Sequence, residues 1–416
     1  MTQSSADARH DSSPINAISN GVPGARVAIV TDGMWRKCLS AIRALGKAGF
    51  RVDVLGDSWL TVGFWSRFTH QRVLSPDAKE NETEFGKVLT AHLQSLAATM
   101  PAGVRPVLFP MEEDTLRYVV NQRETLRRYA DFLVPEADAL EVCANKGATM
   151  ALAARVGVPH PRTEVAESAS DLLKLTADFA GGEFVVKPLR GLGSHGVRYN
   201  PSFDAKTAEP YWQSYGPALV QDRVPPQGAG LGVSLLFGRD GACLAHFCHR
   251  RLQQYPNSGG PSSDRVGIND PALLEKSLTL MRALNWKGVA MVEWKLDPRD
   301  GTPKLMEINP RFWGSLELAV RSGVDFPLLY AQAAAGQPTT YPQPIDAVRC
   351  RWLVPGDILR WITARPAARE PLTTFLRGLP RQAEEWDPQD LRGALACVVC
   401  QGLAVLQPKY WKFLTR

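Results

Sequence analysis

Apolar and polar positions in the first third of the chain follow the order expected of alternating strands and helices. RVAIV at 26–30 predicts a strand, and the next segment, RKCLSAIRALGKAG, has leucine and isoleucine at helical spacing and ends in glycine. FRVDVLG at 50–56 predicts a second strand, which completes a β-α-β unit with a parallel sheet and a right-handed crossover. PVLFP supplies a further strand. We therefore expect a small α/β domain over 26–138.

The pattern changes near residue 139, where helices mix with strands joined by tight turns. NKGATMALAARVGVP at 145–159 predicts a helix that glycine and proline end, and the segment 270–286 predicts another. Strand pairs flanking the turns GRDG and DPRDG indicate antiparallel sheet. This mixture predicts an α+β domain over 139–336. Proline-rich stretches and two or three amphipathic helices predict a mainly helical extension over 337–416, and the polar segment 1–25 predicts a disordered tail.

The composition narrows the class of protein. Of the 416 residues, 44% are hydrophobic and 22% charged, which is typical of a globular protein with two or three domains. The net charge is +6, but no dense basic stripe interleaved with aromatic residues is present, so we expect no nucleic-acid partner. The seven cysteines are irregularly spaced, and Cys397 and Cys400 lie in an apolar run. We therefore expect buried thiols rather than disulfides, a redox pair or a zinc site.

No segment predicts stable insertion into a membrane. The apolar run GALACVVCQGLAVL has about 14 residues, fewer than the roughly 20 that a bilayer-spanning helix needs. The first residues lack the apolar core of a signal peptide, so we expect a cytoplasmic protein. The basic segment PKYWKFLTR at 408–416 is interpreted either as a contact with a membrane surface or as a packed amphipathic tail, and we favour the packed tail.

A glycine-rich segment, GLGSHG at 191–196, lies between two predicted strands. It satisfies the GxGxxG pattern, but strand residues follow it, whereas a dinucleotide-binding loop opens a helix. A protein kinase would carry its lysine after the loop, and here Lys187 precedes it. Glycines let backbone N–H groups approach phosphate oxygens, and Ser194 and His195 add donors. The segment therefore predicts either a phosphate-binding loop with Lys187 at its root or a glycine-rich surface hairpin.

The segment 288–312 predicts a hairpin that carries two carboxylates. Symmetric pairing about its DPRDG turn sets Glu293 opposite Glu307, and Asn309 shares the face of Glu307 because side chains alternate. Paired carboxylates repel, so an apolar hairpin that holds both needs a cation or a shared proton. Oxygen ligands without histidine or cysteine suit Mg²⁺ or Mn²⁺. Arg311 is a candidate to bind a phosphoryl oxygen or a carboxylate; the alternative is a hairpin whose polar face meets water.

Taken in order, these motifs resemble those of the ATP-grasp superfamily of ligases. The matching motifs are NKGAT with Lys146, VVKP with Lys187, the glycine loop, LVQDRV, VEWK with Glu293, and MEINPR. The resemblance covers residues 26 to about 335. It implies an N-terminal α/β pre-ATP-grasp domain followed by a two-subdomain ATP-grasp fold with ATP between the subdomains.

The resemblance also implies roles for individual residues. Glu293, Glu307 and Asn309 would hold Mg²⁺ or Mn²⁺, and Gln221 or Asp222 would replace the glutamate usual beside adenine. The acidic residue that often holds the ribose is missing from QGAGLGVS. The residues implied to contact ATP are Lys146, Lys187, Gly191, Gly193, Ser194, His195, Gly196, Gln221, Asp222 and Val224.

The acyl-substrate pocket is expected around HFCHRRLQQYPNSGGPSSDRVG. Arginine binds carboxylates in a bidentate manner, and a Gly/Ser loop supplies backbone donors, so Arg250 and Arg265 join Arg311 as catalytic candidates. For each arginine the alternative is a solvated basic loop. His249 and His195 are interpreted as hydrogen-bonded structural residues.

The resemblance implies a chemistry without an enzyme nucleophile. A carboxylate attacks the γ-phosphate of ATP, and an amine then displaces phosphate from the acyl phosphate. The expected function is an ATP- and Mg²⁺-dependent ligase that joins a small-molecule carboxylate to an amine, with a homodimer as one option for its assembly. An ATP-dependent phosphotransferase and a non-catalytic ATP-binding module are the alternatives.

Overall fold

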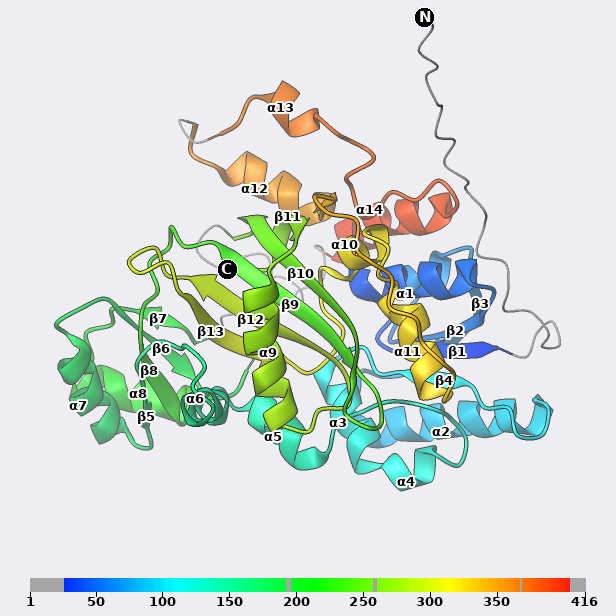
Figure 1. Cartoon of the computed structure of the whole chain (residues 1–416), viewed down its shortest axis with the longest axis horizontal. Helices are drawn as coiled ribbons and strands as arrows, with labels where there is room; N and C mark the ends of the chain where they lie inside the picture. Colours follow the sequence, from blue (N-terminus) through cyan, green and yellow to red (C-terminus); the bar gives the residue numbers. More distant parts are fainter. Residues whose placement is uncertain (1–25, 192–195, 257–259, 367–368, 405–416) are drawn as a thin grey trace, which may run out of the picture.

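The computed structural model describes residues 26–191, 196–256, 260–366 and 369–404, which form a row of three sheets (Figure 1). A four-stranded sheet near the N-terminus and a second four-stranded sheet lie on either side of a central six-stranded sheet. This arrangement agrees with the predicted α/β unit followed by mixed α+β structure. The domain boundaries remain predictions from the sequence.

The N-terminal sheet is parallel and has the strand order β3-β2-β1-β4. Its central strand is buried along its whole length, as the apolar run RVAIV predicts. Its strands are β1 (Val27–Val30), β2 (Arg51–Gly56), β3 (Thr69–Leu74) and β4 (Val107–Phe109). The helices of this part are α1 (Arg36–Lys47), the 3₁₀ helix η1 (Val62–Trp65), α2 (Glu82–Thr99), α3 (Glu113–Asn121) and α4 (Arg123–Leu126).

The second sheet is antiparallel, with the order β5-β8-β6-β7, and two helices pack on it. Three helices near this sheet have side-chain N-caps: Asn145, Ser168 and Asp204 each accept hydrogen bonds from backbone N–H groups of the first turn. The strands are β5 (Thr163–Ala166), β6 (Phe184–Pro188), β7 (Arg198–Tyr199) and β8 (Ala218–Asp222). The helices that precede or cover them are α5 (Ala137–Ala144), α6 (Lys146–Arg155), α7 (Ala169–Phe179) and α8 (Ala205–Tyr215).

The six-stranded sheet has the order β13-β12-β9-β10-β11-β14, and an apolar core packs against each of its faces. Val233 and Trp294 lie in the core beneath α9 (Pro271–Ala283), whereas Phe247 and Met291 share a core with the N-terminal domain. Its first five strands in sequence are β9 (Gly230–Phe237), β10 (Cys243–Gln254), β11 (Ser262–Ile268), β12 (Gly288–Leu296) and β13 (Pro303–Asn309). Helices α10 (Leu316–Arg321) and α11 (Phe326–Ala334) contact α1 and continue the shared core.

The segment after residue 337 contributes the sixth strand, which the sequence did not predict. Strand β14 (Arg349–Arg351) pairs with β11 at the edge of the sheet. The π-helical turn η2 (Leu353–Asp357) and helices α12 (Ile358–Thr363), α13 (Leu372–Leu376) and α14 (Leu391–Ala404) follow. Cys397 and Cys400 are free, buried thiols, as expected. No helix among the described residues combines the length and apolar character that crossing a membrane requires. The basic segment 408–416 lies outside the described residues, so the preference for a packed tail stays a prediction.

Candidate functional site

The hairpin of β12 and β13 carries the predicted carboxylate pair. Glu293 lies directly opposite Glu307, the register that the position of the DPRDG turn predicts. The Asn309 side chain donates from Nδ2 to Glu293 Oε1 at 3.1 Å, so the amide shares the face of the carboxylates. A register shift follows Glu293 and separates this polar group from the pairs nearer the turn, which begin with Trp294 and Leu305. Three oxygen-bearing side chains thus converge on one face of the sheet.

Arg251 of β10 completes this group, and the sequence did not single it out. Its guanidinium donates from Nη2 to Glu293 Oε2. Burial raises the pKa of Glu293, the Arg251 guanidinium opposes the rise, and the Glu307 carboxylate adds to it. Arg251 is the cation that contacts the carboxylate pair directly, and a bound cation would further relieve the repulsion between the two carboxylates.

His249 lies on the same face, two residues before Arg251. Gly232 stands between Glu293 and His249 in the sheet register, and a Cβ at position 232 would lie 2.3 Å from His249 Cε1. Glycine therefore makes room for the imidazole ring. Burial, together with Arg251 and Arg265, lowers the pKa of His249 to about 3, so the ring is neutral. Its Nδ1 is buried without a hydrogen-bond partner among the described residues, and its Nε2 lies 3.5 Å from Ser315 Oγ.

Two predicted lysines lie on the small sheet and at the start of α6. Lys187 Nζ donates to Gln221 Oε1 at 2.9 Å, and Gln221 in turn donates from Nε2 to Thr163 Oγ1 at 2.8 Å. Burial lowers the pKa of Lys187 to about 8, while Glu307 across the site acts in the opposite direction. Lys146 Nζ donates to the Gly191 carbonyl at 2.8 Å, at the root of the glycine loop. These contacts gather cationic groups on the side of the site that faces the carboxylate pair.

The rest of the predicted nucleotide segment is only partly described. Gly193, Ser194 and His195 lie outside the described residues. Gly191 and Gly196 have φ angles of 127° and 77°, which favour glycine, and the Tyr211 hydroxyl donates to the Gly196 carbonyl at 2.9 Å.

The predicted adenine segment leads from the small sheet to the large one. Asp222 ends β8, and β9 begins at Gly230. Val224 is buried, and its carbonyl accepts from Lys295 Nζ at 3.3 Å. The side chain of Gln221 is turned to Lys187 and Thr163. This segment therefore connects the two sheets, as a linker between two subdomains would.

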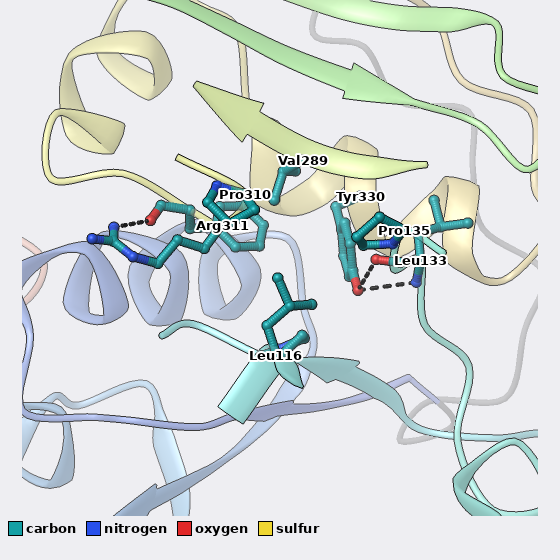
Figure 2. A pocket seen from close by; sticks show the side chains of 9 residues that line it. Leu116, Leu133, Pro135, Val289, Pro310, Arg311 and Tyr330 are labelled. Carbon is teal, nitrogen blue, oxygen red and sulfur yellow. Dashed lines mark hydrogen bonds between the residues drawn. The ribbon is translucent and has the colours of Figure 1, made fainter. Parts of the chain in front are cut away.

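Arg311 is held by the N-terminal domain. Its Nε lies 3.2 Å from Glu112 Oε2, and its Nη1 donates to the Phe312 carbonyl at 3.0 Å. Lys37 Nζ pairs with the other oxygen of Glu112 at 2.7 Å. Figure 2 shows the small, mainly apolar cavity behind this arginine, with the Arg311 side chain extending away from Tyr330. The guanidinium therefore lies at the junction of the domains rather than inside the cavity.

The two other predicted arginines lie away from the carboxylate pair. Arg250 is exposed and pairs in register with Leu231, which belongs to the core beneath α9, so it occupies the face opposite Arg251. Arg265 is fully buried, and its Nη2 donates to Glu384. Arg251, not Arg250, thus reaches Glu293, and Arg265 is paired with Glu384 inside the protein. The assignment of Arg250 and Arg265 to an acyl-substrate pocket stays a prediction.

Comparison with known proteins identifies the fold. The family model described as ATP-grasp in the biosynthetic pathway with Ter operon matches residues 256–354. The carbamoyl phosphate synthase large chain of Deinococcus radiodurans is 28% identical over 202 residues, which are 45% of this chain and 19% of that protein. This chain thus matches about a fifth of the length of that relative.

Solved structures resemble most of the described chain. N5-carboxyaminoimidazole synthetase from Staphylococcus aureus superposes with a TM-score of 0.58 at 13% identity, over 79% of this chain and 82% of that one. Biotin carboxylase from Campylobacter jejuni, solved as a complex with β,γ-ATP, gives 0.60 at 15% identity, over 77% and 74%. L-amino acid ligase from Bacillus licheniformis gives 0.54 at 18% identity, over 76% and 75%. The resemblance that the motifs predicted is therefore confirmed, and the chain has the ATP-grasp fold.

Proposed function

We propose that this protein is an ATP- and Mg²⁺-dependent ligase that joins a carboxylate to an amine through an acyl phosphate. The observation that carries the proposal is the pairing of Glu293 with Glu307, with Asn309 bonded to the first and Lys187 facing the second. The similarity to carbamoyl phosphate synthase and to the solved ligases supports it. Cytoplasmic location and assembly as a homodimer remain predictions.

The donor set fits Mg²⁺. Two carboxylates and one amide supply oxygen ligands, and Mg²⁺ completes its shell with waters and substrate phosphates rather than with a full set of protein ligands. Among the described residues, no three histidine, cysteine or acidic side chains converge, which agrees with such a shared site. Glu293, Glu307 and Asn309 would hold the ion, and the ion would neutralise charge on phosphate oxygens.

The remaining residues of the site would bind and orient ATP and the second substrate. Lys187 and Lys146 approach the space over the carboxylates from the small sheet and from α6, where their charges suit phosphate oxygens. Arg251 holds the Glu293 carboxylate in place through a charged hydrogen bond. Arg311 stands at the domain junction, where its guanidinium suits a carboxylate or phosphoryl oxygen of the second substrate. Such a site acts by positioning and by charge neutralisation.

The test is a coupled assay of ADP release with Mg²⁺, ATP, a panel of carboxylic acids, and hydroxylamine as a general amine. Acid-dependent ADP together with a hydroxamate is the expected result, because hydroxylamine traps an acyl phosphate. A stable phosphorylated product without hydroxamate would show a phosphotransferase instead. If no acid stimulates ADP release, ATP titration with and without Mg²⁺ separates a nucleotide-binding module from a protein without a nucleotide site.

Glu307→Gln tests the metal assignment in the same assay. Turnover should fall by at least about 100-fold, because losing even an outer-shell partner of a metal ligand costs about 10- to 100-fold. Glu275→Gln is the matched control, since this glutamate on α9 is 63% exposed and pairs only with Arg282 on the surface in the described structure. Unchanged turnover in Glu307→Gln would rule out the assigned role.

A further inference from the structure

Two side chains of β10 lie across the neighbouring strand β9, on the side of the carboxylate pair. A Cβ at Gly232 would lie 2.3 Å from His249 Cε1, and a Cβ at Gly230 would lie 2.8 Å from Arg251 Cδ. The two glycines are two residues apart, so they share one face of β9. They leave open the space over β9 that both side chains occupy, and β12 with Glu293 is the next strand (Figure 1).

Each of these two side chains has a buried nitrogen without a hydrogen-bond partner among the described residues. The atoms are His249 Nδ1 and Arg251 Nε. His249 Nε2 lies 3.5 Å from Ser315 Oγ, and when the serine hydroxyl donates to Nε2 the neutral ring carries its hydrogen on Nδ1. Arginine Nε always carries one. Two N–H groups therefore occupy neighbouring positions over β9.

These two donors indicate a missing acceptor. Buried polar groups in proteins almost always have a partner, so two neighbouring donors without one call for an explanation. Positions two apart on a strand are separated by about 7 Å, a span that a carboxylate can bridge by accepting one hydrogen bond at each oxygen. An ammonium group offers no acceptor to either N–H group, so the place does not suit the amine substrate.

The charges nearby favour an anion at this place. Arg251 contributes a guanidinium, and Arg265 of β11, its partner in the strand register, contributes a second. Both arginines act on the His249 ring, which is only 2% exposed. The Arg251 side chain is 21% exposed, so it forms the open end of the place and His249 the closed end.

We propose that His249 and Arg251 form a subsite for a second anionic group of the acid substrate, which makes that substrate a short dicarboxylic acid. Neighbouring strands are about 4.8 Å apart, so a group over β9 lies roughly 5–10 Å from an ion held between Glu293 and Glu307 on the next two strands. The reacting carboxylate must approach the phosphoryl group to about 3–3.5 Å and is therefore a different group of the same molecule. The inference rests on the proposed ligase function, and Ser315 acts in it as a positioning residue.

The test is titration calorimetry of the full chain in the presence of Mg²⁺ and ADP, so that no turnover occurs. The probes are matched pairs: succinate and succinamate, glutarate and glutaramate, glutamate and glutamine. Within each pair one carboxylate is kept, and the second is either charged or a neutral amide of the same size. The difference in affinity within a pair thus reports recognition of the second charge.

Three variants locate the recognition. His249→Phe keeps an aromatic ring over Gly232 but removes both nitrogens. His246→Phe is the matched control, because His246 lies three residues earlier on β10, hence on the opposite face, with its Nδ1 3.3 Å from the Tyr341 hydroxyl. Ser315→Ala removes the contact of the hydroxyl with the His249 ring and is a milder change if His249→Phe does not fold.

The expected result is that at least one dicarboxylate binds about tenfold or more tightly than its amide, since a hydrogen bond to a charged group is worth about this much. His249→Phe should remove most of this preference, Ser315→Ala should reduce it, and His246→Phe should keep it. The proposal is overturned if no dicarboxylate binds, if the amides bind equally well, or if His249→Phe retains the preference. Should His249→Phe not fold, a full preference in Ser315→Ala overturns it.

The ADP-release assay separates this inference from the proposed function. If monocarboxylic acids stimulate ADP release as well as dicarboxylic acids do, the ligase function stands and the subsite is refuted. If dicarboxylates bind selectively but no acid stimulates ADP release, the subsite stands and the ligase function is refuted.

Discussion

Glu384 connects parts of the chain that are far apart in sequence, and Glu384→Gln should destabilise the protein strongly. Arg36 of α1 donates to Glu384 Oε1 at 2.7 Å, and Arg265 of β11 donates to Oε2. The side-chain exposures are 5% for Glu384, 0% for Arg265 and 14% for Arg36. The carboxylate therefore links the N-terminal domain to the central sheet inside the protein.

The expected loss follows from this geometry. Glutamine keeps the shape of the side chain but removes the carboxylate that pairs directly with two buried guanidinium groups. Breaking a buried pair by removing one partner costs about 3–5 kcal/mol, and we expect a loss in this range in the free energy of unfolding at neutral pH. Urea unfolding followed by tryptophan fluorescence measures it.

The pH dependence gives a second readout of the same pair. Burial alone would raise the pKa of Glu384, but Arg265 and Arg36 outweigh it and hold the pKa below the ordinary value of 4.5. The carboxylate thus contributes stability that is present above about pH 4.5 and is lost as the pH falls through the lower folded-state pKa. Glu384→Gln should lack this part of the acid dependence.

Asp300→Asn is the control, because Asp300 pairs with Lys304 at 3.0 Å on the exposed turn of the hairpin. An exposed pair contributes about 0–1 kcal/mol. If Glu384→Gln loses no more stability than Asp300→Asn, the buried network does not hold the domains together and the reasoning is refuted.

Two further predictions concern the site itself. Burial lowers the pKa of Lys187 from 10.5 to about 8, and bound phosphates favour its charged form, so ATP binding should weaken as the pH rises through 8. Calorimetry at this pH should show proton uptake when ATP binds, and Lys187→Met should abolish that uptake. Gly232→Ala should cost about 1–3 kcal/mol of stability and lower turnover, because its Cβ would overlap the His249 ring. Gly182→Ala, which meets open space, is the control, and equal stability of the two variants in urea would contradict the packing argument.

The carboxylate hairpin could be predicted from the sequence because its information is local. Pairing about a centre near Asp300 sets Glu293 opposite Glu307, and the alternation of side chains then places Asn309 on the same face. The observed pairing also requires the register shift between Glu293 and Trp294, because the pairs beside the turn lie one residue out of step with it. The roles of Arg250 and Arg251 could not be separated in this way. Which of them faces Glu293 depends on two registers, that of β9 with β10 and that of β9 with β12. No single short turn specifies both registers.

Strand β14 and the partners of the acidic residues in 384–390 could not be predicted from the sequence for a related reason. Three residues, RCR, carry too little periodicity to predict a strand, and β14 pairs with β11 across more than eighty residues of sequence. The partners of Arg36 and Arg43 are Glu384 and Asp390, each more than three hundred residues away. From the sequence alone, Arg36 and Arg43 in the predicted helix are expected to face solvent. Their burial becomes evident only when Glu384 and Asp390 are found to pack against them.

The N-terminal domain has a definite part in the geometry of the site, even though its first turn lacks a dinucleotide-binding motif. Asp32, two residues after β1 and with a φ of 55°, accepts the backbone N–H of Glu112 at 3.1 Å and the Thr115 hydroxyl at 2.9 Å. Glu112 then pairs with both Lys37 and Arg311. Lys37 also donates to the carbonyl of Phe312, the residue after Arg311, at 3.0 Å. A chain of partly buried polar contacts thus runs from the turn after β1 to the segment that follows β13, so the N-terminal part of the chain holds the Arg311 guanidinium in position.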